Sequence, residues 1–140
     1  MANFPKEIKR KRGFTLIELL VSIAIIGMIA SISVINITKI RMKQRDAQRM
    51  LNVREIVKAL NLYQNQLGKY PTYDGTITGN DSMSQELKNE KTIPAVPSDP
   101  LPPNSYKYKS EDGTGFTITF CLETDSIQGY SVGCGNAMKP

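Results

Sequence analysis

The sequence predicts an α+β protein in which one long N-terminal α-helix packs against a small antiparallel β-sheet head. Three observations predict this class. An apolar run fills residues 14–37, an amphipathic pattern of helical period follows over residues 38–67, and short alternating segments mark the last third of the chain. At 140 residues the chain has room for one modest domain with extensions.

The apolar run from Phe14 to Ile37 is long enough to cross a membrane. Its 24 residues carry one charge, Glu18, and a basic cluster at residues 9–12 precedes it. A helix of this length covers about 36 Å, whereas the hydrocarbon core of a bilayer is about 30 Å thick. Secretory signal peptides have a shorter apolar region and a small-residue cleavage site after it, which is absent here. We therefore expect a membrane helix that is kept.

Glu18 needs an explanation, because a charged carboxylate at the centre of a bilayer costs about 2.5–3.5 kcal/mol. One interpretation is that Glu18 lies near the interface and reaches water. The other is that it pairs with a cation. Cleavage between Gly13 and Phe14 would create such a cation at the new amino terminus, in the same chain or in a neighbouring copy. The residues alone leave both interpretations open.

The second half of the predicted helix has one apolar face. No proline occurs between Lys6 and Tyr70, so one continuous helix of roughly 80 Å is expected over residues 14–67. Gly68 is expected to cap it, and Tyr70-Pro71 to prevent its continuation. Polar cover on the other faces is expected from residues such as Arg45 and Arg49. The expected apolar stripe consists of Val53, Ile56, Val57, Leu60, Tyr63 and Leu67, extended backwards by Ala47 and Met50.

The net charge of +5 is unevenly distributed. Residues 38–58 hold seven bases and two acids, whereas residues 59–140 hold six bases and nine acids. Nucleic-acid binding is not expected of the basic segment from Lys39 to Lys58, because no aromatic residue lies between Phe14 and Tyr63 to stack on bases. A solvated face is expected, or cations that meet anionic lipid head groups or the acidic heads of neighbouring subunits.

Residues 68–140 are expected to form the head, beginning with a long loop over residues 74–104. Within this loop, Asp81 or Ser82 is expected to cap a short helix that ends near Asn89, with Gln85 or Glu86 completing a capping box. Residues 93–104 contain five of the eight prolines and are therefore expected to be extended and non-helical.

A small antiparallel sheet is expected over residues 105–135. Its strands are predicted at residues 105–110 and 115–123, joined by a turn at 111–114, with residues 129–135 as a third strand. In the second strand an apolar face is expected to pack on Val57, Leu60 and Leu67 of the long helix; its members are Phe116, Ile118, Phe120 and Leu122.

The two cysteines, Cys121 and Cys134, enclose 12 residues. A disulfide between them would stabilise the fold by about 3 kcal/mol and would persist only in an oxidising compartment, whereas a cytosolic protein would keep two free thiols. A zinc site is not expected, since the chain has no histidine. Catalysis is not expected either, because the chain has no histidine to serve as a general base and no P-loop.

Residues 11–20, KRGFTLIELL, resemble the processing site of bacterial type IV prepilins and type II secretion pseudopilins. The resemblance implies a pilin-like fold, a leader at residues 1–13, and a membrane peptidase that cuts after Gly13 and methylates Phe14. It further implies that Glu18 guides assembly. Residues 14–37 would be the transmembrane and assembly half of the helix, residues 38–67 its amphipathic half, and residues 68–140 the head.

The same resemblance implies a structural subunit that polymerises into a type IV pilus or a type II secretion pseudopilus. Its partners would be further copies of itself, alone or with minor pilins, the prepilin peptidase and methylase, and an inner-membrane assembly platform with its ATPase. The precursor would cross the cytoplasmic membrane once with its head outside, before it joins an extracytoplasmic filament. The alternative is a monomeric, membrane-anchored extracytoplasmic binding protein.

Two segments of the head resemble the major pseudopilins of type II secretion, namely GKYPT at residues 68–72 and SDP at residues 98–100. In that group a nearby loop binds calcium, and Asp99 and Asp125 are the candidates here. However, the aromatic–glycine pair that usually follows Asp-Pro is replaced by Leu-Pro-Pro at residues 101–103. Calcium takes six to eight oxygens, which two aspartates do not supply. The cysteine pair, by contrast, is more typical of pilins. No other cofactor is expected.

Overall fold

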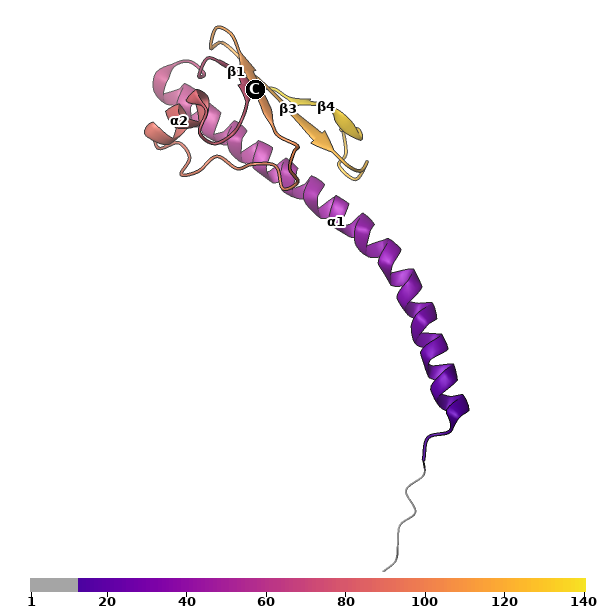
Figure 1. The fold of residues 1–140 in the computed structure, drawn as a ribbon. Coiled ribbons are helices and arrows are strands. Elements are labelled where there is room, and N and C mark those ends of the chain that lie inside the picture. The colour runs from indigo at the N-terminus through magenta and orange to yellow at the C-terminus, as the bar shows by residue number, and fades with distance from the viewer. Residues whose placement is uncertain (1–12) are drawn as a thin grey trace, which may run out of the picture. The chain divides into compact units, whose positions relative to one another are not determined.

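The computed structural model describes residues 13–140, and of residues 32–36 it describes the backbone alone. The described chain forms two compact units, one up to Thr38 and one from Lys39 to Pro140. It contains two helices, α1 (Leu16–Leu67) and α2 (Ser82–Asn89), and four strands, β1 (Tyr73–Thr76), β2 (Lys107–Ser110), β3 (Thr117–Leu122) and β4 (Gly133–Met138) (Figure 1). The predicted α+β class is confirmed. The expected leader at residues 1–13 lies outside the described residues except for Gly13.

In the first unit, α1 carries apolar side chains that contact little else. The exposed fraction of the large apolar side chains between Phe14 and Ile29 ranges from 50% at Val21 to 81% at Leu16. The helix begins at Leu16, two residues after the expected start, and continues without interruption. Of the helices that the structure describes, none is both long enough and apolar enough to cross a membrane.

In the second unit, a four-stranded antiparallel sheet with the order β1-β2-β3-β4 lies beside the C-terminal half of α1 (Figure 1). The strands β2 and β3 were expected. The strand β1 was not, because Tyr-Asp-Gly-Thr has no apolar alternation. Its pairing with β2, from Tyr73 opposite Ser110 to Thr76 opposite Lys107, supplies the backbone hydrogen bonds that define it.

The third predicted strand was placed too early. The structure has a turn at residues 127–130, where the amide of Tyr130 donates to the carbonyl of Ile127 at 3.2 Å, and β4 begins only at Gly133. Gly129 and Gly133 have φ values of 87° and 108°, which suit glycine and interrupt regular strand geometry. The strand then pairs with β3 as far as Met138, opposite Ile118.

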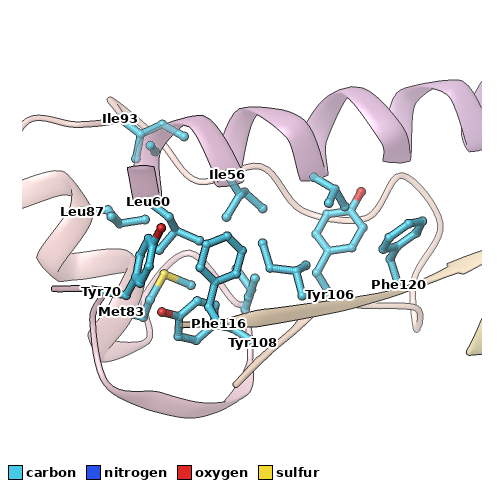
Figure 2. Packing of buried hydrophobic residues seen from close by; sticks show 14 of the residues in the cluster. Ile56, Leu60, Tyr70, Met83, Leu87, Ile93, Tyr106, Tyr108, Phe116 and Phe120 are labelled. Atoms are coloured by element: carbon cyan, nitrogen blue, oxygen red, sulfur yellow. The ribbon is translucent and has the colours of Figure 1, made fainter. Parts of the chain in front are cut away.

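The core lies between α1, the sheet and α2 (Figure 2). Val53, Ile56 and Leu60 of α1 are fully buried, and the predicted apolar face of β3 is buried against them, with exposures of 0–4%. The expected contribution of Leu67 was wrong, since 46% of its side chain is exposed where the helix ends, and Val57 is only half-buried. Further buried members of the core are Tyr63, Tyr70, Ile77, Met83, Leu87, Ile93, Tyr106 and Tyr108.

The ends of the helices follow the predicted rules with one exception. Gly68 has a φ of 75°, and its amide donates to the carbonyl of Gln64 at 2.7 Å, as a helix-ending glycine should. Asp81 caps α2 by accepting from the amide of Ser84 at 2.9 Å. The expected capping box does not close, because the Gln85 side chain donates to the carbonyl of Asn80. Glu86 instead accepts from the Tyr63 hydroxyl at 2.8 Å, which joins α2 to α1.

Burial predicts which of two equivalent truncations on α1 destabilises the head. Replacing the fully buried Leu60 with alanine should lower the free energy of unfolding by about 2–5 kcal/mol, because it removes apolar contacts and leaves a cavity. The same change at Leu51, which is 60% exposed, should cost less than about 0.5 kcal/mol. Urea unfolding of the detergent-solubilised protein, followed by circular dichroism, measures both. Equal losses would contradict the packing described here.

Candidate processing and assembly site

The predicted processing site lies directly before α1. Gly13 and Phe14 are exposed and non-helical, with 77% of the Phe14 side chain exposed. A Cβ added to Gly13 would meet no atom within 4 Å, so nothing in the described chain itself requires glycine there. The bond between these residues is therefore in an accessible segment that a peptidase can bind in extended form. The roles of Gly13 and Phe14 stay predictions.

Glu18 is held by its own helix terminus. Thr15 occupies the N-cap of α1, and its amide and its hydroxyl donate to Glu18 Oε2 at 3.0 and 2.9 Å. In return, the Glu18 amide donates to the Thr15 Oγ1 atom at 3.3 Å. This is a capping box, which satisfies two amides that a helix terminus otherwise leaves unbonded. In the uncleaved chain Glu18 therefore has a local partner that the sequence interpretation did not include.

A second group of charges lies in the head, and we call it the charge cluster: Arg45, Asp46, Arg49, Asp99 and Glu123. Its centre is Arg49, whose side chain is fully buried. The Arg49 guanidinium donates to both oxygens of Asp99, at 2.8 and 3.1 Å, and to Asp46 at 2.9 Å and Glu123 at 2.7 Å. Arg45 adds a bidentate contact to Glu123.

The carboxylates of the charge cluster also bind backbone amides. Asp46 accepts from the amides of Glu123 and Thr124 at 2.9 and 2.7 Å, and Asp99 accepts from the amide of Leu101 at 2.8 Å. Among the described residues, no buried side-chain nitrogen or oxygen is left without a hydrogen-bond partner. The cluster thus connects α1 to the proline-rich loop and to the end of β3.

The charge cluster shifts the titration of its members. Hydrogen bonds from Arg45, and then from Arg49, outweigh partial burial and lower the pKa of Glu123 to about 2. For Arg49, burial alone would lower the pKa, but the hydrogen bonds to Asp99, Glu123 and Asp46 outweigh it and raise the pKa above its usual value. These shifts favour the charged forms of both Glu123 and Arg49.

The sequence interpretation of Arg45 and Arg49 as solvated cover was wrong. One signal was present: Asp46 and Arg49 lie seven and four residues before Val53, so they continue the apolar stripe towards the N-terminus. Their partners Asp99 and Glu123 are 50 and 74 residues from Arg49, and no local pattern links residues so far apart. The expected place of Ala47 in the stripe was also wrong, since Ala47 is exposed.

The predicted disulfide between Cys121 and Cys134 is confirmed and joins β3 to β4. It lies at an irregularity of their pairing, between Phe120 opposite Asn136 and Leu122 opposite Gly133. Two residues of β4 oppose one of β3 at this point, as in a β-bulge. The bond therefore ties the edge strand β4 to the centre of the sheet.

Comparison with known proteins agrees with the geometry of the N-terminal site. Residues 8–34 match the model of the prokaryotic N-terminal methylation motif. The type II secretion system core protein G of Vibrio cholerae is 28% identical over 129 residues, which cover 89% of this chain and 88% of that protein. The chain is similar to prepilins and pseudopilins, at its N-terminal motif and along most of its length.

Further relatives fall into the two branches of the prepilin and pseudopilin family. The type II secretion system core protein G of Aeromonas hydrophila is 26% identical over 91% of this chain and 93% of its own length. The type IV major pilin protein PilA of Myxococcus xanthus is 31% identical, over 49% of this chain and 31% of its own length. These relatives are secretion-system core proteins and a pilin, so the similarity is to filament subunits and not to enzymes. No solved structure matches the chain significantly.

For this prepilin-type chain, the structure places the two calcium candidates in different surroundings. Both oxygens of Asp99 accept from Arg49, so a cation there would compete with a guanidinium. Asp125 is exposed and lies beside Thr124 at the end of β3. Within residues 13–140, no three His, Cys, Asp or Glu side chains are grouped as a metal site requires. Calcium binding through Asp99 and Asp125 stays a prediction.

The charge cluster predicts a large effect of removing Arg49. Replacing Arg49 with methionine should lower the free energy of unfolding by about 3–5 kcal/mol, because the buried Asp46 and Asp99 lose their countercharge. Arg54→Met, on an exposed position of the same helix, should change stability by less than about 0.5 kcal/mol. Chemical denaturation of both variants measures the difference. A mild loss in Arg49→Met would show that the cluster is not needed to hold the head.

The lowered pKa of Glu123 predicts an acid dependence of stability. A carboxyl whose folded pKa lies below its unfolded value stabilises the fold above the unfolded pKa, and this contribution is lost as the pH falls through the folded pKa. The window here runs from about pH 4.5 down to about 2. Glu123→Gln should remove this part of the pH dependence of unfolding. Parallel urea titrations between pH 2 and 7 test it, and identical pH profiles would contradict it.

Proposed function

We propose that this chain is a precursor that is cut after Gly13, methylated on Phe14 and polymerised into an extracytoplasmic filament through its N-terminal helix half. The observation that carries this proposal is the first unit of the structure. Its helix exposes apolar side chains on every face, at 50–81% between Leu16 and Ile29. Apolar surface of this extent needs cover from lipid or from other apolar helices.

The capping box explains how Glu18 is tolerated before assembly. Thr15 supplies two hydrogen bonds to the carboxylate, which reduces the cost of holding it at the start of an apolar segment. Cleavage after Gly13 would place a new amine at Phe14, next to Thr15. In a filament this amine, of the same or a neighbouring copy, would neutralise Glu18. A subunit out of register would bury an uncompensated carboxylate, so the pairing would set the axial position of each subunit.

The membrane stage of the proposal rests on the apolar sequence of residues 14–37. We place the precursor in the cytoplasmic membrane with its head outside. There it would meet the prepilin peptidase and then an assembly platform powered by an ATPase. The Cys121–Cys134 disulfide supports this location of the head, since such bonds persist in oxidising compartments.

Between the two kinds of filament, we favour a type II secretion pseudopilus. The similarity to the core protein G of Vibrio cholerae extends over 89% of the chain and thus includes the head, whereas the similarity to PilA covers 49%. The cysteine pair supports the pilus as the second candidate, and electron microscopy distinguishes long surface fibres from their absence.

Replacing Glu18 with valine should separate processing from assembly. Because valine is tolerated in lipid, the variant should insert and be processed, and mass spectrometry should find N-methylated Phe14 in both the native and the variant protein. The yield of filaments, counted by electron microscopy of material isolated from cells that overproduce the protein, should fall by more than tenfold, because the register contact is lost. Glu18→Gln, which keeps the hydrogen bonds with Thr15 but not the charge, should also fail to assemble.

Two results would contradict the proposal in different ways. An intact leader on the native protein would indicate a membrane-anchored monomer and not a filament subunit. Filaments of normal length and yield in Glu18→Val would leave the filament function intact and refute the register role of Glu18.

A further inference from the structure

The structure divides the basic segment after the apolar run into parts with different roles. Arg45 and Arg49 form ion pairs within the charge cluster. Lys39, Arg41 and Lys43, at the start of the second unit, are exposed, and in the part of the chain that the structure describes none of them forms an ion pair. We call these three residues the collar.

The members of the collar lie around the helix and not along one face. In an α-helix Lys39 and Lys43, four residues apart, share a face, whereas Arg41 is rotated by about 200° and lies on the opposite side. All three lie within α1, so their positions follow this geometry. A protein partner that docks on one face of the helix would contact Lys39 and Lys43 or Arg41, but not all three. A surface that surrounds the helix contacts all of them.

The height of the collar fits a layer of lipid head groups. From Lys39 to Lys43 the helix rises about 6 Å. Bilayers are about 40–45 Å thick with their head groups and about 30 Å without them, which leaves about 5–7 Å for each head-group layer. Ile40, between the cations, is 53% exposed, so the collar also presents apolar surface that suits the boundary between head groups and acyl chains.

We infer that the collar binds the phosphate groups of anionic phospholipids around the helix and fixes the depth of the precursor in the membrane. The inference rests on the membrane stage of the proposed function. Anionic lipid attracts each nearby Lys or Arg by a free energy that corresponds to about fivefold in association. The collar thereby sets how far the head stands from the bilayer before assembly.

Lys39 and Lys43 also border a hollow that contains Glu123 and Asp125 of the head. Glu123 already accepts from Arg45 and Arg49, so it has little capacity for a further cation. Arg41, on the opposite side of the helix, has no acidic group of this kind beside it among the described ion pairs. Arg41 is therefore the member of the collar for which lipid is the clearest partner.

The test reconstitutes the full-length protein into vesicles of phosphatidylcholine with about 20–30% phosphatidylglycerol, which gives the vesicles an anionic surface. Spin-labelled versions of the two lipids report their relative association with the protein by electron paramagnetic resonance. We expect the native protein to prefer phosphatidylglycerol by about fivefold at low salt. The preference should decrease in 1 M salt, where the screening length is about 3 Å.

The variants distinguish a ring from a one-sided contact. Neutralising all three collar residues to glutamine should bring the preference close to one, whereas Arg41→Gln alone and Lys39→Gln with Lys43→Gln should each reduce it in part. Arg54→Gln with Lys58→Gln removes two exposed charges further along α1 and should leave the preference unchanged.

Three results would overturn the inference. A native protein that inserts but does not prefer phosphatidylglycerol would refute lipid binding by the collar and leave the membrane stage of the proposed function intact. So would a triple variant that keeps the lipid preference but fails to form filaments, since the collar would then contact neighbouring subunits. A native protein that does not float with the vesicles would instead refute the membrane stage of the proposed function, and the collar with it.

Discussion

The buried guanidinium of Arg49 is the contact on which the position of the head depends. Apolar packing is non-directional, whereas a guanidinium that donates to three carboxylates fixes both distance and orientation. Two of these carboxylates come from outside the helix, Asp99 from the proline-rich loop and Glu123 from the end of β3. Because each acid is needed to compensate the buried cation, loop, sheet and helix reach their register together. The apolar stripe from Val53 to Tyr63 then continues the same helix face towards Gly68.

The sequence was sufficient to predict structural features that depend on interactions between residues close together in the chain. The long helix, its stop at Gly68, the cap at Asp81 and the buried face of β3 follow from periodicity and local hydrogen bonding, and all are confirmed. The features that were missed depend on distant partners. β1 exists through pairing with β2, and Arg49 is buried through acids 50 and 74 residues away. At the N-terminus, the Thr15–Glu18 capping box is also local, and a threonine three residues before a glutamate at the start of an apolar run is its sequence signature.

The seven bases between Lys39 and Lys58 show why a charge run should not be interpreted as one surface. Two of them, Arg45 and Arg49, belong to the charge cluster, and three lie around the helix directly after the apolar residues. The other two, Arg54 and Lys58, are exposed further along α1. A count of charges from the sequence assigns the same charge of +1 to each of these residues. Burial and available acids separate them, and only those without acids retain long-range attraction for an outside partner.

The division of the described chain into two compact units has a consequence for assembly. Every contact that fixes the head to α1, from the charge cluster to Tyr63 with Glu86, lies within residues 39–140. A subunit that leaves lipid for a filament changes the surroundings of residues 14–31, whose side chains contact little of their own chain. The head therefore does not need to repack when that exchange occurs. The group whose surroundings change most on assembly is then the Glu18 carboxylate. Its hydrogen bonds with Thr15 must offset its desolvation until a countercharge lies beside it.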